Sequence, residues 1–377
     1  MSDTELNGLG GGPSLFEIED LLKMVASQGI SDVHLRVGTP PVVRKDCMMM
    51  KTTMEPISVE DIERTIKKIM PQKFQEKINQ LHDFDFSFEM EGVSRFRVNF
   101  LHDLGNPALV FRIVPFRIPS IESLYLPPVL KNFTTLNNGL VLITGPTGCG
   151  KSTTLASILD HLNQNSQKHI ITLEDPIEFI HMNKKSVFTQ RQLGVDTDTF
   201  PNGLKYALRQ DPDVILIGEM RDRDTINSAL KAAETGHLVF STLHTTDAVQ
   251  TINRIINYFE PHERESIRIQ IAQTLQGTIA QKLIKKADNK GRVPATEILV
   301  ATPAVKDYIM RDEIDKIYEL IKAADYDEML SMNRSMLRLV QAKLITQETA
   351  LKMSDNSVEM EIMLKGAFHG TSSYIEQ

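Results

Sequence analysis

The sequence predicts an α/β protein with an N-terminal α+β domain and a helical C-terminal region. Before residue 115, several segments alternate apolar and polar residues as half-buried strands do. From residue 139 to about residue 243, short and wholly apolar segments alternate with amphipathic helical patterns, which is typical of parallel strands covered by helices. The 377 residues are 41% hydrophobic and 24% charged, so the chain is long and apolar enough for two folded domains.

The N-terminal α+β domain is expected to span residues 15–114, after a flexible leader at residues 1–14. A helical pattern opens it, and a half-buried strand follows. Ser58 and Asp61 predict the start of a second helix, which Pro71 ends. An antiparallel meander is predicted from three alternating segments, at residues 84–88, 96–100 and 109–113.

A proline-rich stretch at residues 115–128 is expected to be a semi-rigid linker between the two domains. Residues 129–301 are expected to form the α/β core. Its strands are predicted at residues 140–143, 170–173, 214–217 and 238–240, with an edge strand at 298–300. Helical patterns fill residues 302–353, and the weak signals of residues 354–377 predict a weakly ordered tail.

Charge and cysteine content exclude several classes of protein. The chain has 42 basic and 49 acidic residues, a net charge of −7, so the general basic surface of a nucleic-acid-binding protein is missing. Two cysteines exclude a disulfide framework and a cysteine-rich zinc site. The start of the chain is polar and no window approaches 18 apolar residues. We therefore expect a cytoplasmic protein that is neither exported nor membrane-spanning.

One segment matches the phosphate-binding loop pattern and follows a predicted apolar strand. Its residues are Gly145, Pro146, Thr147, Gly148, Cys149, Gly150, Lys151, Ser152 and Thr153. Glycines let such a loop fold around an anion with its amides pointing inward, and the following helix N-terminus favours negative charge. We expect it to bind ATP, with Lys151 on the β- and γ-phosphates and Ser152 on Mg²⁺. The alternative is a plain glycine turn.

A second acidic group is needed at the end of a neighbouring strand, to orient the water around magnesium or the attacking water. Glu219, which follows the strand at residues 214–217 after Gly218, is the first candidate for catalysis and for the metal. A surface glutamate is the alternative. A second acidic segment, with Glu174, Asp175 and Glu178, follows another strand, and a solvated loop is its alternative.

Two histidines bracket the predicted strand at residues 238–240. His244 follows the carboxyl end of the strand, where ligands of parallel sheets gather, and is a candidate γ-phosphate sensor. For His237, at the other end, a packing or capping role is equally expected. Arg95, Arg97 and Arg112 lie on strands of the first domain. They form either a solvated strand face or a basic group that closes over the phosphates from a neighbouring subunit.

These motifs, in this order, resemble the secretion-type hexameric ATPases, and most closely the type IV pilus retraction ATPases of the PilT and PilU kind. The match covers about residues 15–343. Its marks are residues 31–35, 95–99, 145–153, 171–178 (an Asp box), 208–222 (an atypical Walker B segment) and 234–244 (a His box). The resemblance implies a PAS-like N-terminal domain, a RecA-like ATPase core, a ring of six, and ATP held between the two domains.

The resemblance also implies roles for individual residues. Lys151 and Ser152 correspond to the Walker A contacts, and Glu219 to the Walker B glutamate. Glu174 corresponds to the Asp-box acid, and His237 and His244 to the His-box pair, with His237 on the nucleotide. Arg97 and Arg112 resemble the arginine pair that the N-terminal domain offers to nucleotide. The implied partners are an inner-membrane pilus platform protein and, indirectly, pilin, which places the protein at the cytoplasmic side of the pilus base.

Two departures bear on the function. Assembly-type relatives carry a tetracysteine zinc module and an extra N-terminal domain, and this sequence has neither the cysteines nor the length expected for them, which favours pilus retraction. Residues 304–311 match the retraction signature Ala-Ile-Arg-Asn-Leu-Ile-Arg-Glu only in part. The sequence therefore leaves open a retraction motor and a PilU-like accessory that works beside a paralogous retraction ATPase with little hydrolysis of its own. A DNA-translocating ring is disfavoured by the charge balance.

Overall fold

The computed structural model describes residues 16–45, 48–75, 78, 82–114, 118–324 and 329–366. The chain divides into two compact units, Met1–Arg117 and Ile118–Gln377. The leader expected at residues 1–14 and the first part of the expected linker, residues 115–117, lie outside the described residues. Within the described ranges, no helix combines the length and apolarity that crossing a membrane requires.

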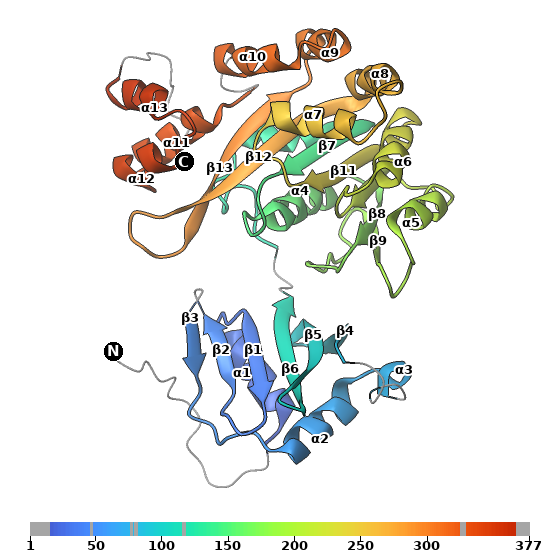
Figure 1. Cartoon of the computed structure of the whole chain (residues 1–377), viewed down its shortest axis with the longest axis vertical. Coiled ribbons are helices and arrows are strands. Elements are labelled where there is room, and N and C mark those ends of the chain that lie inside the picture. Colours follow the sequence, from blue (N-terminus) through green and yellow to red (C-terminus); the bar gives the residue numbers. More distant parts are fainter. Residues whose placement is uncertain are drawn as a thin grey trace. The chain divides into compact units, whose positions relative to one another are not determined.

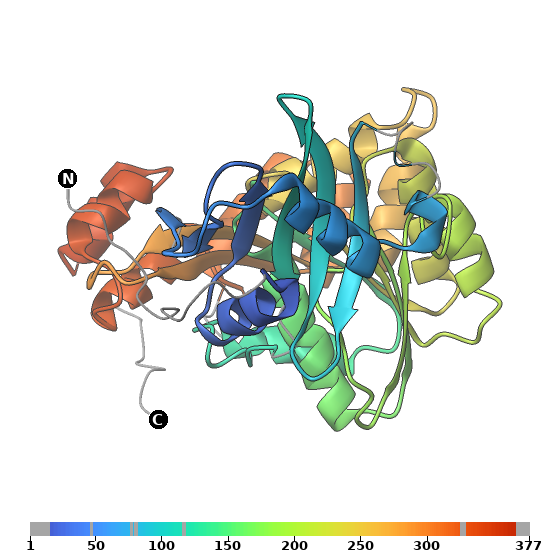
Figure 2. The same cartoon turned by 90° about the horizontal axis from the view of Figure 1, so that it is seen from below.

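The first unit is built on a six-stranded antiparallel sheet with the strand order β3-β2-β1-β6-β5-β4 (Figure 1). Its helices α1 and α2 lie against one face of the sheet (Figure 2). The strands are β1 (Asp32–Arg36), β2 (Val42–Lys45), β3 (Met48–Lys51), β4 (Phe84–Met90), β5 (Ser94–Asp103) and β6 (Asn106–Val114), and the helices are α1 (Ile18–Ser27), α2 (Val59–Ile69) and α3 (Gln72–Gln75). The predicted meander is thus confirmed as β4-β5-β6.

Local sequence signals set these elements. Phe96, Val98 and Phe100 on β5 are fully buried, and the residues between them are partly exposed, because successive strand side chains point to opposite faces. Helix α2 begins as predicted: Ser58 and Asp61 form a capping box in which each side chain bonds the other's backbone amide. Its last residues precede Pro71.

The second unit is built on a seven-stranded sheet with the order β13-β12-β7-β11-β10-β8-β9. Every neighbouring pair is parallel except the edge strand β13, which is antiparallel to β12. The strands are β7 (Gly139–Thr144), β8 (His169–Glu174), β9 (Val187–Gln192), β10 (Val214–Ile217), β11 (Leu238–Leu243), β12 (Leu275–Lys285) and β13 (Arg292–Val300). The mixed α/β fold class that the sequence predicts is confirmed.

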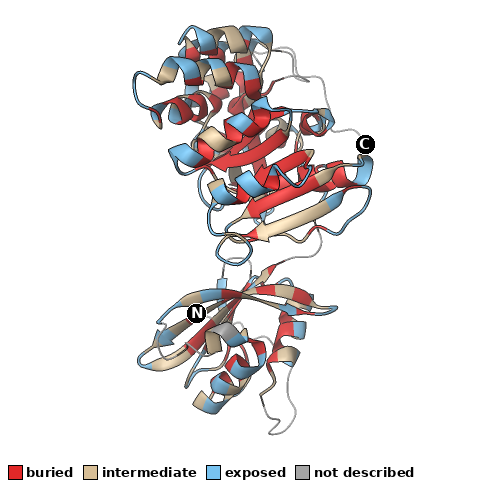
Figure 3. Ribbon diagram, turned by 90° about the vertical axis from the view of Figure 1, so that its right-hand side faces the viewer, coloured by how far each residue is buried: buried red, intermediate tan, exposed pale blue. Residues whose placement is uncertain are grey.

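Both faces of this sheet are covered, which explains why its strands are apolar throughout (Figure 3). On β7, Leu140 and Leu142 pack with one group of helices, while Val141 and Ile143 pack with the other. The first group includes α6 (Arg223–Glu234), α7 (Ala248–Asn257), α8 (Arg264–Thr274), α9 (Pro303–Met310) and α10 (Ile317–Ala323); the second holds α4 (Lys151–Asn165) and the 3-10 helix Pro128–Thr135. Helix α5 (Phe200–Ala207) packs against α6.

The structure differs from the expected linker in residues 118–128. Ile121 and Leu126 are buried in the core of the second unit, so this part of the proline-rich stretch is packed against the unit. The prolines restrict the backbone, but the apolar residues between them still gain free energy by leaving water. Ile121 and Leu126 therefore belong to the second unit and not to a free linker.

The C-terminal residues form a small helical cluster against the β12-β13 hairpin (Figure 1). Its helices are α11 (Met332–Gln341), α12 (Gln347–Met353) and α13 (Ser357–Leu364). Helix α13 lies inside the tail that the sequence predicts to be weakly ordered, and that expectation is wrong for this segment. Met360 and Met363 are buried in the cluster, so tertiary packing stabilises a helix whose own periodicity is weak. Residues 367–377 lie outside the described part.

Candidate active site

Four neighbouring parallel strands end at the same edge of the second sheet, and each end carries a residue singled out in the sequence. Across this edge the order of strands is β7, β11, β10 and β8. The phosphate loop follows β7, and His244 follows β11. Glu219 follows β10 after Gly218, and Glu174 is the last residue of β8. Ligands of open parallel sheets bind at this edge, so the topology brings the candidate residues to one place.

The phosphate loop has the backbone that its glycines predict. Gly145, Gly148 and Gly150 have φ angles of 141°, 77° and 92°, a region that residues with a side chain rarely adopt. Helix α4 begins directly after Gly150. The Lys151 ammonium donates hydrogen bonds to the carbonyl oxygens of Gly145, at 2.8 Å, and Pro146, at 3.2 Å. A positive charge is therefore held inside a loop that opens onto a helix N-terminus, where an anion is favoured.

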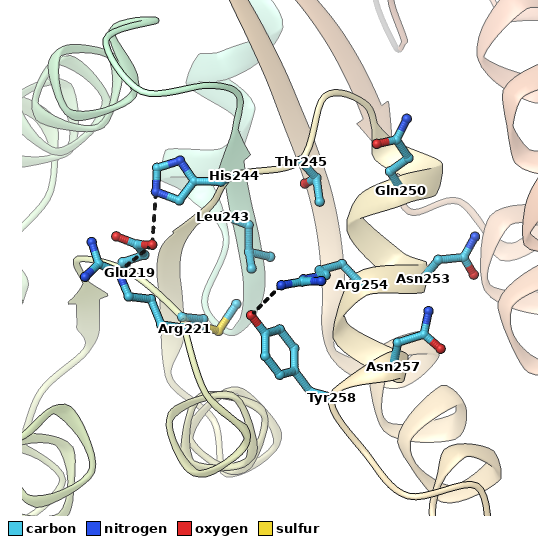
Figure 4. Close-up of a pocket in the computed structure, with 11 residues that line it drawn as sticks. Glu219, Arg221, Leu243, His244, Thr245, Gln250, Asn253, Arg254, Asn257 and Tyr258 are labelled. Carbon is cyan, nitrogen blue, oxygen red and sulfur yellow. Dashed lines mark hydrogen bonds and ion pairs between the residues drawn. The ribbon is translucent and has the colours of Figure 1, made fainter.

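Glu219 is the centre of a small polar cluster (Figure 4). Its Oε1 lies 3.0 Å from His244 Nε2 and accepts a hydrogen bond from Arg221 Nε at 2.8 Å. Burial raises the pKa of the Glu219 carboxyl, but the hydrogen bond from Arg221 and the positive charge of Lys151 help to outweigh burial, so the pKa lies below its usual value. Glu219 is thus an ionised carboxylate within electrostatic range of Lys151 in the phosphate loop.

Glu174 has the opposite electrostatic environment. Thr172 Oγ1 donates a hydrogen bond to Glu174 Oε1 at 2.6 Å, and Gln190 Nε2 lies 3.3 Å from the same oxygen. Burial nevertheless raises the pKa of this carboxyl to about 7, because desolvation of the charged form outweighs these hydrogen bonds. A carboxyl that titrates near neutral pH can exchange a proton, whereas Glu219 stays charged.

A pocket of about 560 Å³ adjoins the Glu219 cluster. Figure 4 shows that helix α7 supplies one wall of polar side chains, with Gln250, Asn253 and Arg254 among them. Arg254 donates a hydrogen bond to the Tyr258 hydroxyl at 3.3 Å. The pocket thus extends the edge of the sheet with groups that can bind polar or charged parts of a ligand.

The first unit holds the predicted arginine pair. Arg97 on β5 and Arg112 on β6 are directly paired across the two strands. Like charges in this position repel each other, and each arginine has an acidic partner: Arg97 NH2 bonds Asp85 Oδ2 at 2.7 Å, and Arg112 Nε bonds Asp32 Oδ1 at 2.8 Å. Both guanidinium groups remain partly exposed, with side-chain exposures of 37% and 67%.

His237 does not join the other candidates at this edge. It precedes β11, and its backbone carbonyl pairs with the amide of Gly139, at the start of β7. Its Nδ1 lies 3.0 Å from the carbonyl oxygen of Ala232 near the end of helix α6. Within this chain His237 is therefore on the opposite edge of the sheet from the phosphate loop, in the capping position that the sequence offered as one alternative. His237 precedes β11 and His244 follows it, so the length of this strand separates the two histidines.

Comparison with known proteins identifies the family of this chain. The family model "Type II/IV secretion system protein" matches residues 18–364. The chain belongs to this family. It is 43% identical over 334 residues to the type IV pilus retraction ATPase PilT of Pseudomonas aeruginosa, covering 89% of this chain and 97% of that protein.

Two further matches extend over most of the chain. The type IV pilus ATPase PilU of Pseudomonas aeruginosa is 36% identical over 349 residues, covering 93% of this chain and 91% of that protein. The crystal structure of the pilus retraction motor PilT with bound ADP has a TM-score of 0.85 at 40% identity, covering 92% of this chain and 99% of that one. The resemblance drawn from the motifs is confirmed at the level of the family and of the fold.

Several residues at this site were not predicted from the sequence. The polar wall of α7 had a signal, because Gln250, Asn253 and Asn257 recur at helical spacing opposite the buried stripe that includes Ile252 and Ile255. Gln281 on β12 was also not predicted. It is buried and contacts the phosphate loop, which lies about 130 residues earlier in the chain. No local pattern marks such a contact.

Proposed function

We propose that this ATPase is a motor that powers type IV pilus retraction by hydrolysing ATP. The observation that carries the proposal is the placement of Lys151 in the phosphate loop after β7 and of Glu219 at the end of β10, two strands away at the same sheet edge. Support for retraction as the work performed comes from the similarity to PilT, which is described as a pilus retraction motor.

The proposed division of work follows from the chemistry of each group. The loop amides and Lys151 bind the β- and γ-phosphates, and Glu219 orients or deprotonates the attacking water with Glu174 as a second acid. His244, 3.0 Å from Glu219, senses the γ-phosphate. A hydroxyl from Ser152 and, through water, the Glu219 carboxylate are hard oxygen donors of the kind that Mg²⁺ prefers. Magnesium would supply charge neutralisation on the phosphates.

The assembly is proposed from the family resemblance. Six copies would form a ring, and Arg97 and Arg112 would meet the nucleotide, since a planar guanidinium neutralises transition-state charge well. Closure of the two domains on ATP and reopening after hydrolysis would supply the displacement. The proposed partners are an inner-membrane platform protein of the pilus and, through it, pilin. The proposed place is therefore the cytoplasmic face of the inner membrane.

The decisive experiment for this function replaces the loop lysine. Lys151→Ala should abolish phosphate release at saturating ATP, because the ammonium is the group that meets the β- and γ-phosphates. Lys231→Ala, an exposed lysine near the end of α6, is the matched control and should keep full turnover. Normal turnover by a folded Lys151→Ala protein would refute the assignment of the site.

A second candidate function has its own support. PilU is similar over nearly the same length as PilT, and residues 304–311 match the retraction signature only in part. In this alternative the chain binds ATP and regulates a paralogous retraction ATPase. Steady-state phosphate release by the purified chain separates the two: sustained turnover supports the motor, and negligible turnover with intact ATP binding supports the accessory.

A further inference from the structure

Gln281 is a buried side chain on β12 that joins the phosphate loop to the helix that follows it. It is 2% exposed. Its Nε2 donates a hydrogen bond to the carbonyl oxygen of Cys149 at 2.6 Å, and its Oε1 accepts one from Thr154 Oγ1 at 2.7 Å. Thr154 is in the first turn of α4, so one amide group bridges the loop and the start of its helix.

These contacts fix the direction of a peptide group in the loop. In a planar trans peptide the carbonyl and the following N–H point in opposite directions. Because the Cys149 carbonyl points to Gln281, the N–H of Gly150 must point away from β12. Inward-pointing amides are what a phosphate loop offers to its ligand. A free peptide group next to glycine could rotate, and the bond to Gln281 opposes that rotation.

The loop is also pressed closely against Gln281. A Cβ atom on Gly145 would lie 2.4 Å from the Gln281 carbonyl oxygen, and one on Gly150 would lie 2.8 Å from Gln281 Nε2. Gly145 is therefore required by the approach of the β12 backbone as well as by its φ angle, and a side chain at Gly150 would displace the Gln281 amide. The shape of the loop depends on this neighbouring strand.

We propose that Gln281 is a positioning residue for nucleotide binding, which holds the Cys149–Gly150 peptide in the orientation that presents its amide to the phosphates. This inference rests on the proposed function of the loop as the ATP site. Gln281 acts through the loop and does not touch the nucleotide. Because the loop amides would hold the β-phosphate, which ADP and ATP share, the loss of Gln281 should weaken both nucleotides alike.

The sharpest variant is Gln281→Glu. Glutamate has nearly the same shape and can still accept from Thr154, but a carboxylate cannot donate to the Cys149 carbonyl and repels it. We expect the Kd for a fluorescent ADP analogue to rise about tenfold or more. Gln281→Met, which removes both contacts without repulsion, should raise it by a smaller factor. The matched control is Gln276→Glu, the same change on the same strand beside Gly139, at the edge away from the loop.

Each protein is also melted without nucleotide, which separates positioning from a purely structural role. A folded Gln281→Glu protein with ADP and ATP affinities within about twofold of the unchanged chain would overturn the inference. A lower Tm of Gln281→Met with unchanged nucleotide affinity would also overturn it, because Gln281 would then have only a structural role. If Gln281→Glu does not fold, Thr154→Val removes the hydroxyl that holds the amide, and unchanged ADP affinity there would also overturn it. Failure of the proposed function is distinct, since it appears as normal hydrolysis by Lys151→Ala.

Discussion

Glu219 and Glu174 are two carboxyl groups at one sheet edge, and their surroundings shift their pKa values in opposite directions. Burial alone would raise the pKa of Glu219, but Arg221 and Lys151 help to lower it below its usual value. Glu219 therefore stays ionised as the pH falls through the ordinary range of glutamate. Burial raises the pKa of Glu174 to about 7. Different environments thus suit one group to orient water and the other to exchange a proton.

Replacing Glu219 tests the first role. Glu219→Gln keeps the size of the side chain but removes the charge that orients the attacking water, so phosphate release should fall by at least about 100-fold. The ADP affinity should change little, because the loop amides and Lys151 remain. Glu319→Gln, an exposed glutamate on α10, serves as the control and should keep its turnover. Turnover within about tenfold of the original would remove Glu219 from the mechanism.

Replacing Glu174 tests its raised pKa through stability. Between the ordinary value of 4.5 and about 7, the folded protein keeps a proton that the unfolded chain releases, so this carboxyl lowers the free energy of unfolding as the pH rises. The full loss is about 3 kcal/mol. In urea unfolding at pH 5 and pH 8, Glu174→Gln should therefore lose less stability than the original protein.

The same series has an internal comparison. Burial also raises the pKa of Glu297 to about 7, so a part of the pH dependence, of the same sign, should survive in Glu174→Gln. Identical slopes for the original protein and Glu174→Gln would show that Glu174 is not protonated near neutral pH.

Among the elements, those with a strong local pattern were predictable and those held by distant contacts were not. The capping box of Ser58 and Asp61 marks the start of α2 in the sequence, and the structure contains it. Helix α13 has an N-cap, because Asn356 Oδ1 accepts from the Glu359 amide at 3.1 Å, but its apolar residues show little helical periodicity. It is held by Met360 and Met363, which are buried in the C-terminal cluster. The glycine pattern predicted the phosphate loop, but no local pattern indicated that the shape of the loop depends on β12.

The glycines of the loop differ in what surrounds them, which allows a test of that dependence. A Cβ on Gly145 would lie 2.4 Å from the Gln281 carbonyl oxygen, whereas one on Gly148 would have no atom within 4 Å. Gly148→Ala should therefore cost only the strain of a positive φ, about 1 to 2 kcal/mol. Gly145→Ala adds a backbone clash and should cost clearly more in nucleotide-free urea unfolding. Equal losses would show that the loop is not pressed against β12 in solution.

At the scale of the whole molecule, the parallel topology explains which site residues could be found from sequence. Strand ends that carry Glu219, His244 and the loop meet at one edge because their strands are parallel neighbours. The same rule separates His237, which precedes its strand. The contact of Gln281 with the loop joins segments 132 residues apart at Cys149, so only the folded chain reveals it.

The arginines of the first unit offer a test of whether the two units work together, and Arg97 is the better choice. Asp32, the partner of Arg112, is buried, so removing Arg112 would take away a main partner of a buried charge and destabilise the unit. The Arg97–Asp85 pair is half-exposed, with side-chain exposures of 37% and 45%, and such pairs contribute at most about 1 kcal/mol. A large functional effect of Arg97→Ala would therefore not be a stability effect.

We expect Arg97→Ala to lower phosphate release by at least about 100-fold while the free energy of unfolding changes by no more than about 1 kcal/mol, because a guanidinium that meets the γ-phosphate stabilises transition-state charge. Asp85→Asn is the matched control: it breaks the same ion pair but leaves the guanidinium, so its turnover should stay within a few-fold of the original. If both variants lose turnover equally, the loss comes from breaking the ion pair and not from a contact of the guanidinium with the nucleotide. If neither does, the Arg97 guanidinium does not reach the nucleotide, and ATP hydrolysis is carried out by the second unit without it.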